Sequence, residues 1–304
     1  MIAYRIFGES HGDEIGIEVK GMPRIDVDMG KVAAFMARRS ANAPRHEPDV
    51  PVFVWDGDVM RATIRNVDQR PQDYANVRTV PRPGHADYSS WITTGGIPTG
   101  GGKWSGRLTA PLCAAGAVAL QILSTRGISV AARVVECDGR KGGDPGMLAD
   151  VPGDDSCGAV VEVVAEGVPA GLGDAGEDGL ESKFARAFFG ISAVKGVEFG
   201  DGFRLAAMRG SEANDAFTVV DGKVTLRTNR CGGILGGISI GMPIVARVAF
   251  KPTPSISREQ DSVDLVTLKP VKLTIKGRHD KCVAFRGCPA VESAMALVIL
   301  GELV

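Results

Sequence analysis

The sequence of 304 residues has almost no net charge, and it contains no long apolar run. Its 35 Lys and Arg residues nearly balance 36 Asp and Glu, so the net charge of −1 provides no bulk positive field for nucleic acid or anionic lipid. The longest nearly apolar stretch, residues 112–123, falls short of the roughly 18 residues that span a bilayer and is expected to form a buried helix. We therefore expect no nucleic-acid partner and no membrane association.

The six cysteines include no C-x-x-C pair, and we expect no secretory signal before them. This pattern indicates neither a disulfide framework nor a zinc site. No two of the four histidines have the i, i+4 spacing of a helical metal site, so we expect no metal. Reduced thiols are the default in the cytoplasm, which is the expected location.

Glycine, by contrast, is abundant, with 40 residues that cluster at positions 95–106, 167–176 and 232–241. Such clusters indicate turns, or backbone that approaches a ligand closely. Two nucleotide motifs are excluded: Trp104 follows Gly100-Gly-Gly-Lys103 where a P-loop needs Ser or Thr, and residues 232–237 lack the Rossmann spacing. The clusters therefore indicate a binding site of another kind.

The apolar pattern predicts strands at 2–7, 15–19, 128–135, 159–166, 244–250 and 272–275, and hairpins at Asp56-Gly57 and Asp221-Gly222. Helices are expected at 28–39, 109–126, 180–189 and 290–303, the first capped by Asp28 and the second ended by Gly127. Residues 66–106 contain four Pro and seven Gly and predict a long, functional loop. Strands and helices do not alternate strictly, which favours an α+β fold. No linker divides the chain, so we expect one domain over residues 1–304.

Three histidines, His11, His85 and His279, lie in turns beside glycine and an acidic residue or arginine. A loop histidine is a natural proton carrier near neutral pH, although capping or simple exposure explains most single cases. Arginines also lie in or beside Gly- and Pro-containing loops, where the planar guanidinium suits carboxylate and phosphate. They are Arg38, Arg39, Arg45, Arg82, Arg107 and Arg278. The pattern predicts a pocket for a multiply anionic metabolite, or else a set of solvated side chains.

Ten short motifs follow one another between residues 8 and 280. They are Gly8-Glu-Ser-His-Gly12, Asp68-Gln-Arg70, Gln72-Asp-Tyr74, Arg82-Pro-Gly-His-Ala-Asp-Tyr88, Gly167-Val-Pro-Ala-Gly-Leu-Gly173, Ala193-Val-Lys-Gly-Val197, Gly200-Asp-Gly-Phe203, Gly232-Gly-Ile-Leu-Gly-Gly-Ile-Ser239, Lys251-Pro-Thr253 and Gly277-Arg-His-Asp280. In this order they resemble the chorismate synthase family. The resemblance covers essentially the whole chain.

The resemblance implies a β-α-β sandwich, with helices packed between two antiparallel sheets, assembled as a homotetramer. It implies a lyase of the shikimate pathway of aromatic amino acid biosynthesis. This enzyme converts 5-enolpyruvylshikimate 3-phosphate to chorismate and phosphate by 1,4-elimination, with reduced FMN and no net redox change. NADPH would act only indirectly, in flavin reduction, and without a dinucleotide motif we expect an external reductase. The alternatives are a noncatalytic flavin- or anion-binding homologue that has lost turnover, and a structural oligomer.

Site roles carry over by motif. By resemblance, His11 stabilises or protonates the departing phosphate, His85 lies near flavin N1 and the C2 carbonyl, and Asp280 lies near flavin N5 and helps remove the C6 proton. Substrate binding is assigned to Arg39, Arg45, Arg107 and Arg278. Flavin binding is assigned to Arg82, Lys103, Trp104, Ser105, Ser192, Ala193, Gly236, Lys251, Pro252, Thr253, Pro254, Ser255 and Arg278.

Residues 100–110 depart from the family pattern. Lys103, Trp104 and Leu108 stand where the family usually has Arg, Ser and Glu, and lysine lacks the bidentate geometry of arginine. Ser192 replaces a usual Asn, Lys281 replaces a usual Pro, and the segment 40–47 is several residues shorter. We expect these changes to affect flavin affinity and the phosphate end of the site more than the fold.

Overall fold

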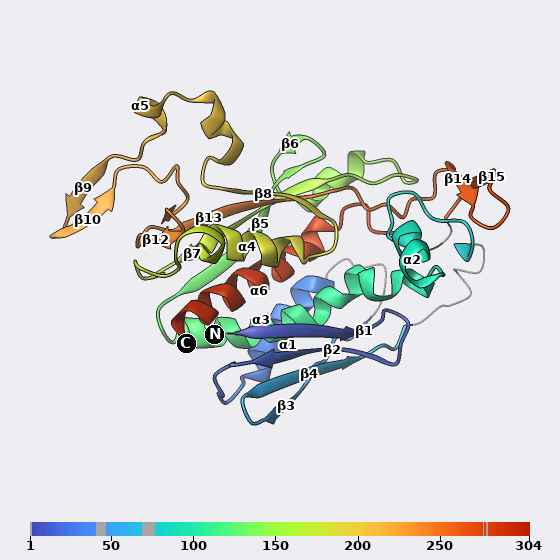
Figure 1. The fold of residues 1–304 in the computed structure, drawn as a ribbon, viewed down its shortest axis with the longest axis horizontal. Coiled ribbons are helices and arrows are strands. Elements are labelled where there is room, and N and C mark those ends of the chain that lie inside the picture. Colours follow the sequence, from blue (N-terminus) through green and yellow to red (C-terminus); the bar gives the residue numbers. More distant parts are fainter. Residues whose placement is uncertain (1, 41–46, 69–76, 276, 278) are drawn as a thin grey trace.

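The computed structural model describes residues 2–40, 47–68, 77–275, 277 and 279–304. The main elements form three layers, a four-stranded sheet, a layer of helices and a five-stranded sheet (Figure 1). Neighbouring strands are antiparallel in both sheets. The predicted α+β class and β-α-β sandwich are therefore confirmed.

The first sheet has the order β1 (Ala3–Gly8), β2 (Glu14–Lys20), β4 (Val59–Arg65) and β3 (Val52–Asp56). Apolar residues alternate along its two central strands, so one face is buried, including Ile15 and Ile17 of β2 and Ile64 of β4. The predicted hairpin joins β3 to β4, but its turn residues are Gly57 and Asp58, because Asp56 is paired with Val59. The polar turn that joins β1 to β2 lies at the end of these strands, next to the pair Gly8 and Ile15.

The helical layer contains α1 (Met29–Ser40), α3 (Thr109–Ser124), α4 (Leu180–Phe189) and α6 (Ala284–Leu303). Asp28 caps α1 as predicted, since its Oδ1 accepts hydrogen bonds from the backbone of Gly30 and Lys31. Helices α3 and α6 pack closely, because a Cβ at Gly116 would lie 2.2 Å from the Cβ of Ser293. Glycine at this position therefore lets the two helices approach.

Two helical segments, residues 99–124 and 284–303, are long and apolar enough to cross a membrane by length and composition. Within them, 72% and 78% of the apolar window is buried inside the protein. The two sheets lie on either side of these helices and cover their apolar surface (Figure 1). Both are therefore core helices of the sandwich, as predicted for residues 112–123.

The second sheet has the order β6 (Arg140–Lys141), β5 (Ser129–Cys137), β7 (Ala159–Glu166), β13 (Ile244–Phe250) and β8 (Val194–Phe199). Every second residue of β7 and β13 is buried against the helices. Three small hairpins extend from the sandwich: β9 (Phe217–Val220) with β10 (Lys223–Leu226), β11 (Ile234–Leu235) with β12 (Ile238–Ser239), and β14 (Gln260–Asp264) with β15 (Lys269–Leu273). They lie at the two ends of the molecule (Figure 1).

Several predicted boundaries were wrong. The region 66–106 is not all loop, since it contains α2 (Asp87–Thr94) and the 3₁₀ helix η2 (Thr99–Trp104), and a second 3₁₀ turn, η3 (Gly106–Leu108), begins at its end. Helix α6 begins six residues earlier than position 290 and includes Pro289, which is accommodated near its first turns. Strand β8 was not predicted. It pairs with β13 on one side only, and Gly196 weakens its strand pattern.

Candidate active site

The turn between β1 and β2 carries His11 and packs against the first glycine cluster. The Oγ of Ser10 lies 3.1 Å from Nδ1 of His11 and donates a hydrogen bond of 3.0 Å to the carbonyl of Gly100. Residues 100–102 all have left-handed backbone, and a Cβ at Gly100 would lie 2.2 Å from the imidazole ring. Glycine at position 100 therefore allows the close approach to His11.

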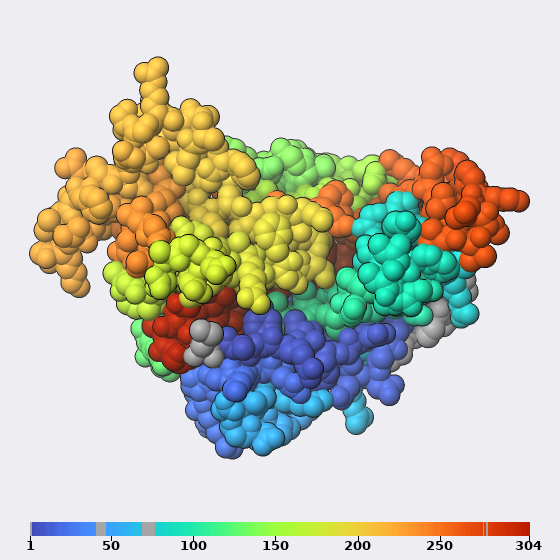
Figure 2. All heavy atoms as spheres, in the orientation of Figure 1, coloured from blue at the N-terminus to red at the C-terminus, as the bar shows by residue number. Residues whose placement is uncertain are grey.

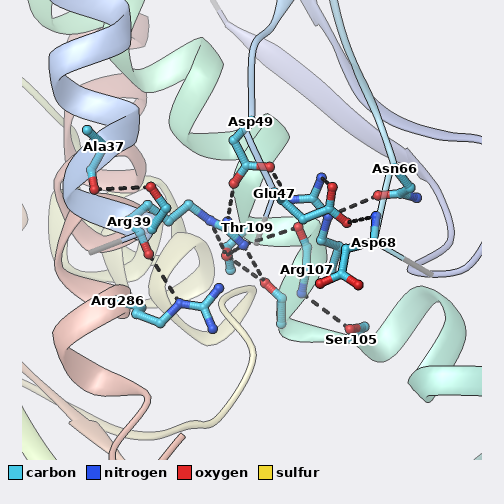
Figure 3. A network of polar contacts seen from close by, with 12 residues as sticks. Ala37, Arg39, Glu47, Asp49, Asn66, Asp68, Ser105, Arg107, Thr109 and Arg286 are labelled. Atoms are coloured by element: carbon cyan, nitrogen blue, oxygen red, sulfur yellow. Dashed lines mark hydrogen bonds and ion pairs between the residues drawn. The ribbon is translucent and has the colours of Figure 1, made fainter. Parts of the chain in front are cut away.

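Two buried arginines, Arg39 of α1 and Arg107 of η3, share one carboxylate (Figure 3). Asp49 accepts a 2.6 Å hydrogen bond from Nη1 of Arg39 through one oxygen and bonds Nη1 of Arg107 through the other. Arg39 also donates to Oγ1 of Thr109 at 3.1 and 3.2 Å. Burial lowers the pKa of Arg39 from its usual value, against the opposing effect of Asp49. The carboxylate thus fixes both guanidinium groups and balances part of their charge.

Asn66 connects this pair to the His11 turn. Its side-chain amide donates hydrogen bonds to the carbonyls of Glu9 at 3.1 Å and Gly12 at 2.8 Å, while its oxygen accepts one from Nε of Arg107 at 2.9 Å. One buried side chain therefore holds the ends of the histidine turn and orients an arginine. The His11 turn and Arg107 therefore belong to one hydrogen-bonded group.

One nitrogen of the Arg107 guanidinium group makes no hydrogen bond with the described residues. Its Nη2 is buried and has no hydrogen-bond partner among the described residues, although Oε2 of Glu47 lies 3.7 Å away. Glu47 itself accepts a hydrogen bond of 3.0 Å from the backbone of Val67. A buried guanidinium nitrogen without a hydrogen bond is costly, and an anionic ligand would satisfy it.

Asp280 is linked to the same group through Arg286 of α6, which Figure 3 shows beside Arg39. Nη1 of Arg286 donates to Oδ2 of Asp280 at 2.8 Å, and its Nε donates to the carbonyl of Arg39 at 3.1 Å. The Arg286 side chain therefore bridges the carboxylate of Asp280 and the backbone of Arg39. His279, the remaining loop histidine, instead hydrogen-bonds the carbonyl of Ile275 through Nε2 at 3.2 Å.

A second group forms around His85. Its Nε2 lies 2.7 Å from Oγ of Ser255, and its Nδ1 lies 3.2 Å from the carbonyl of Pro83. Burial, aided by the nearby charge of Arg82, lowers the pKa of His85 from 6.5 to about 4, so the imidazole is neutral at pH 7. A neutral ring must donate from Nδ1 to the carbonyl of Pro83, and its Nε2 then accepts the hydroxyl hydrogen of Ser255.

Four of the segments assigned to flavin are joined by direct contacts. Lys251 donates from Nζ to the carbonyl of Gly84, and its backbone nitrogen donates to Ala193 at 3.0 Å. Ser192 donates from Oγ to the carbonyl of Trp104 at 3.4 Å. The contacts run from the His85 turn through residues 251–255 and 192–193 to residue 104. On this face of the molecule, a hollow lies between the blue N-terminal sheet, the teal region of α2 and the yellow region of α4 (Figure 2).

Arg82 and Lys103 have partners of their own. Arg82 is buried and forms a bidentate pair with Asp87 of α2, at 2.7 and 2.8 Å. The exposed Lys103 places its Nζ 4.7 Å from the centroid of the Trp104 ring. Ser105 accepts a hydrogen bond from the backbone of Arg107 and so caps η3. The substituted positions 103 and 104 therefore contact each other, and the retained Ser105 and Arg107 keep their local structure.

Gly236 lies apart from the other residues assigned to flavin. It is in the tight turn of the β11–β12 hairpin, with φ +60, beyond the start of β13, whereas residues 251–255 follow the end of that strand. The seven residues of β13, which lies between them along the chain, span about 23 Å. Figure 1 shows β12 and β14 at opposite ends of the molecule. Arg45 and Arg278 lie outside the described residues.

Four residues that organise the site belong to no sequence motif: Glu47, Asp49, Asn66 and Arg286. Asp49 has φ +47, and all four are bound to groups more than five residues away in sequence. All four are polar residues outside the predicted strands and helices, a property that many surface residues share. Spatial proximity alone revealed them.

The fold and the site together define a β-α-β sandwich enzyme with a buried arginine pair next to a histidine turn. Residues 2–304 match the family model for chorismate synthase. Curated chorismate synthases from Lancefieldella parvula and Thermococcus gammatolerans are each 40% identical, over 98% and 100% of this chain and 93% and 96% of their own length. The chain belongs to the chorismate synthase family.

Two further comparisons agree. The chorismate synthase of Chitinophaga pinensis is 41% identical over 99% of this chain and 94% of its own length. A crystal structure of chorismate synthase superimposes with a TM-score of 0.74, covering 99% of this chain and 91% of that chain at 23% identity, which supports the fold. The alignment with the Thermococcus protein extends over 344 positions, more than the 304 residues of this chain. That relative therefore contains residues that have no counterpart in this chain.

Proposed function

We propose that this chain converts 5-enolpyruvylshikimate 3-phosphate to chorismate and phosphate by 1,4-elimination with reduced FMN. One observation carries the proposal: Asn66 holds the His11 turn and Arg107 together, next to Arg39. The substrate has one phosphate and two carboxylates, and the two guanidinium groups complement part of this negative charge. Family membership and the curated relatives support the same reaction.

Substrate anions would bind at the arginine pair. The Nη2 of Arg107, which lacks a hydrogen-bond partner among the described residues, is the atom that we assign to a substrate oxygen. Arg39 has the carbonyls of Gly106 and Arg107 within 3.4 Å of its Nη2 and would act mainly by charge. Arg45 and Arg278 remain assigned to the substrate through the family motif alone.

Proton transfer would use His11 and Asp280. His11 stands beside the glycine run and would protonate or stabilise the departing phosphate. Asp280 has one carboxylate oxygen held by Arg286 at 2.8 Å, which orients the other oxygen, and we assign it to removal of the C6 proton. Arg286 therefore couples the position of this base to Arg39.

The group around His85 fits a flavin. Oγ1 of Thr253 is buried and has no hydrogen-bond partner among the described residues, as expected where a ligand supplies one. Reduced FMN, when bound, supplies an electron-rich ring that assists loss of the leaving group. Because its pKa is about 4, His85 would act there as a neutral, oriented hydrogen-bonding group rather than as a cation. Burial also lowers the pKa of Lys251, which stays the nearest cation in that segment.

The remaining assignments depend on assembly and supply. Apolar side chains on the β9–β10 hairpin are largely exposed, including Phe217 and Val224 at 68% and 70%, which supports the proposed homotetramer. If Gly236 binds flavin, it does so in the site of a neighbouring copy, since its own subunit separates it from residues 251–255. We propose an external source of reduced FMN, with NADPH acting only there, and a cytoplasmic location. All six cysteines are free thiols, which suits that compartment.

The test is anaerobic incubation with reduced FMN and the enolpyruvyl substrate. Chorismate absorbance and released phosphate should rise together and in equal amounts. Binding of flavin and substrate by calorimetry without either product would refute the proposal and favour the noncatalytic homologue. The structure does not favour that alternative, because the altered residues 103 and 104 leave Ser105, Arg107 and Thr109 in their hydrogen bonds.

A further inference from the structure

Three cysteines, Cys137, Cys157 and Cys282, are brought together by the fold, although they are far apart in sequence. Cys137 ends β5, Cys157 precedes β7 and Cys282 precedes α6. Their Sγ atoms all lie within 4.8 Å of one another, and those of Cys137 and Cys157 are 3.7 Å apart. Each residue is at most 5% exposed. The arrangement is a convergent set of three sulfur ligands outside the active site.

The spacing suits one shared central atom. An atom equidistant from three sulfurs that are at most 4.8 Å apart lies at most about 2.8 Å from each, against about 2.3 Å for a zinc–sulfur bond. Small inward shifts of the side chains would therefore bring all three within bonding distance. Among the described residues, no histidine or carboxylate joins the cluster as a fourth ligand.

The charge of the ligand decides which element fits. All three side chains are buried, and three thiolates around one atom contribute one negative charge each. A monovalent or divalent metal ion would therefore leave net negative charge in the protein interior. Zinc in structural sites also takes four ligands, whereas the described residues offer three here. A trivalent atom with three sulfur ligands forms a neutral complex and avoids the cost of buried charge.

We propose that Cys137, Cys157 and Cys282 form a three-thiol binding site for a trivalent thiophilic metalloid, with arsenite as the probe. In the reaction As(OH)₃ + 3 RSH → As(SR)₃ + 3 H₂O, three arsenic–sulfur bonds replace three arsenic–oxygen bonds. Each thiol hydrogen leaves as part of water. Arsenic stays trivalent, no electron is transferred, and the complex carries no charge.

The site adjoins the segment that carries Asp280. Cys282 lies two residues further along the chain, and the backbone nitrogen of Cys157 donates to the carbonyl of Lys281 at 2.9 Å. Nζ of Lys281 in turn donates to the carbonyls of Leu148 at 3.1 Å and Val151 at 2.8 Å. Drawing the three sulfurs inward would shift the position of Asp280. Occupancy should therefore inhibit turnover, and this effect alone depends on the proposed function.

The binding test uses the intact chain, titrated with sodium arsenite and followed by native mass spectrometry and near-ultraviolet absorbance. We expect one arsenic per chain with loss of three water molecules. This binding should be lost in Cys157→Ala and in Cys282→Ala. It should persist in Cys113→Ala, a matched control, because Cys113 is equally buried in α3 but lies outside the cluster. Arsenic binding that survives both cluster variants would overturn the proposal, as would no binding by the wild-type chain.

Calorimetry in two buffers of different ionisation enthalpy counts the protons released. Arsenite should release none, whereas zinc or copper(I) would displace thiol protons. If zinc or copper(I) binds tightly and arsenite does not bind, the choice of arsenite as the ligand is wrong. Inhibition of chorismate formation by arsenite is a separate measurement. A chain that binds arsenite but makes no chorismate would refute the proposed function and leave the thiol site established.

Discussion

Asp49→Asn removes one negative charge from between two buried guanidinium groups. The carboxylate bonds both Arg39 and Arg107, which are 2% and 6% exposed. Asparagine has nearly the same shape and tolerates the left-handed backbone at this position, where φ is +47. The substitution therefore changes the charge and little else.

The expected cost follows from leaving buried charge without its partner. Breaking a buried ion pair in this way destabilises a protein by about 3–5 kcal/mol. The amide oxygen of Asn still accepts one hydrogen bond, and Glu47 stays 3.7 Å from Arg107. We therefore expect the free energy of unfolding to fall by about 3 kcal/mol, the lower end of that range. The catalytic rate should fall as well, since both arginines lose their fixed position.

Urea unfolding followed by circular dichroism measures the loss. The matched control is Asp150→Asn, which breaks a surface ion pair with Arg140 and should leave the unfolding midpoint unchanged. A loss below about 1 kcal/mol, the value of an exposed pair, would refute the view that Asp49 balances the two arginines. So would equal losses in the two variants.

Three further predictions concern the histidines and the glycine run. His85 has a pKa of about 4 in the folded protein and 6.5 when exposed, so the unfolded state binds its proton more tightly. Folding stability should therefore be unaffected above pH 6.5 and should fall by roughly 3 kcal/mol as the pH drops from 6.5 to 4. Urea titrations of His85→Gln should show a smaller fall over this interval, and an unchanged slope would contradict the assignment. Gly100→Ala should lower turnover far more than Gly101→Ala. Both glycines have left-handed backbone, but only the methyl group added at position 100 would contact His11, at 2.2 Å. Similar rates in the two variants would show that this contact is unimportant. His11→Ala should slow phosphate release by about 10²–10⁴, the range for a lost general acid, while the circular dichroism spectrum stays unchanged. A wild-type rate would remove His11 from the mechanism.

Local patterns determined most of the elements. Asp28 caps α1 and Gly127, with φ +72, follows the end of α3, because each satisfies backbone groups within a few residues. The Asp221-Gly222 turn has positive φ at both residues, as a two-residue hairpin requires. The sequence pattern did not predict the structure where contacts with other segments determine it. Helix α6 continues through Pro289, and the Oγ of Ser293 bonds its carbonyl at 2.6 Å within the closely packed core.

The site was only partly predictable. Motifs identified His11, His85, Arg39, Arg107 and Asp280, and the structure links the first of these to Arg107 and the last to Arg39. It also showed that Lys103 contacts Trp104 and that Gly236 lies near the opposite end of β13. No motif marked Asp49 or Asn66, since a polar residue beside a strand resembles any surface residue. Their role depends on which groups surround them after folding.

By itself, the sequence determined the class of fold and the main helices and strands, and it supplied the residues that we propose for the chemistry. These depend on apolar period, capping residues and glycine, which act over a few positions along the chain. Only the tertiary structure decided the protonation state of His85, the shared carboxylate of Asp49 and the meeting of Cys137, Cys157 and Cys282. Burial and charge compensation arise between segments far apart in sequence, so no local pattern contains them.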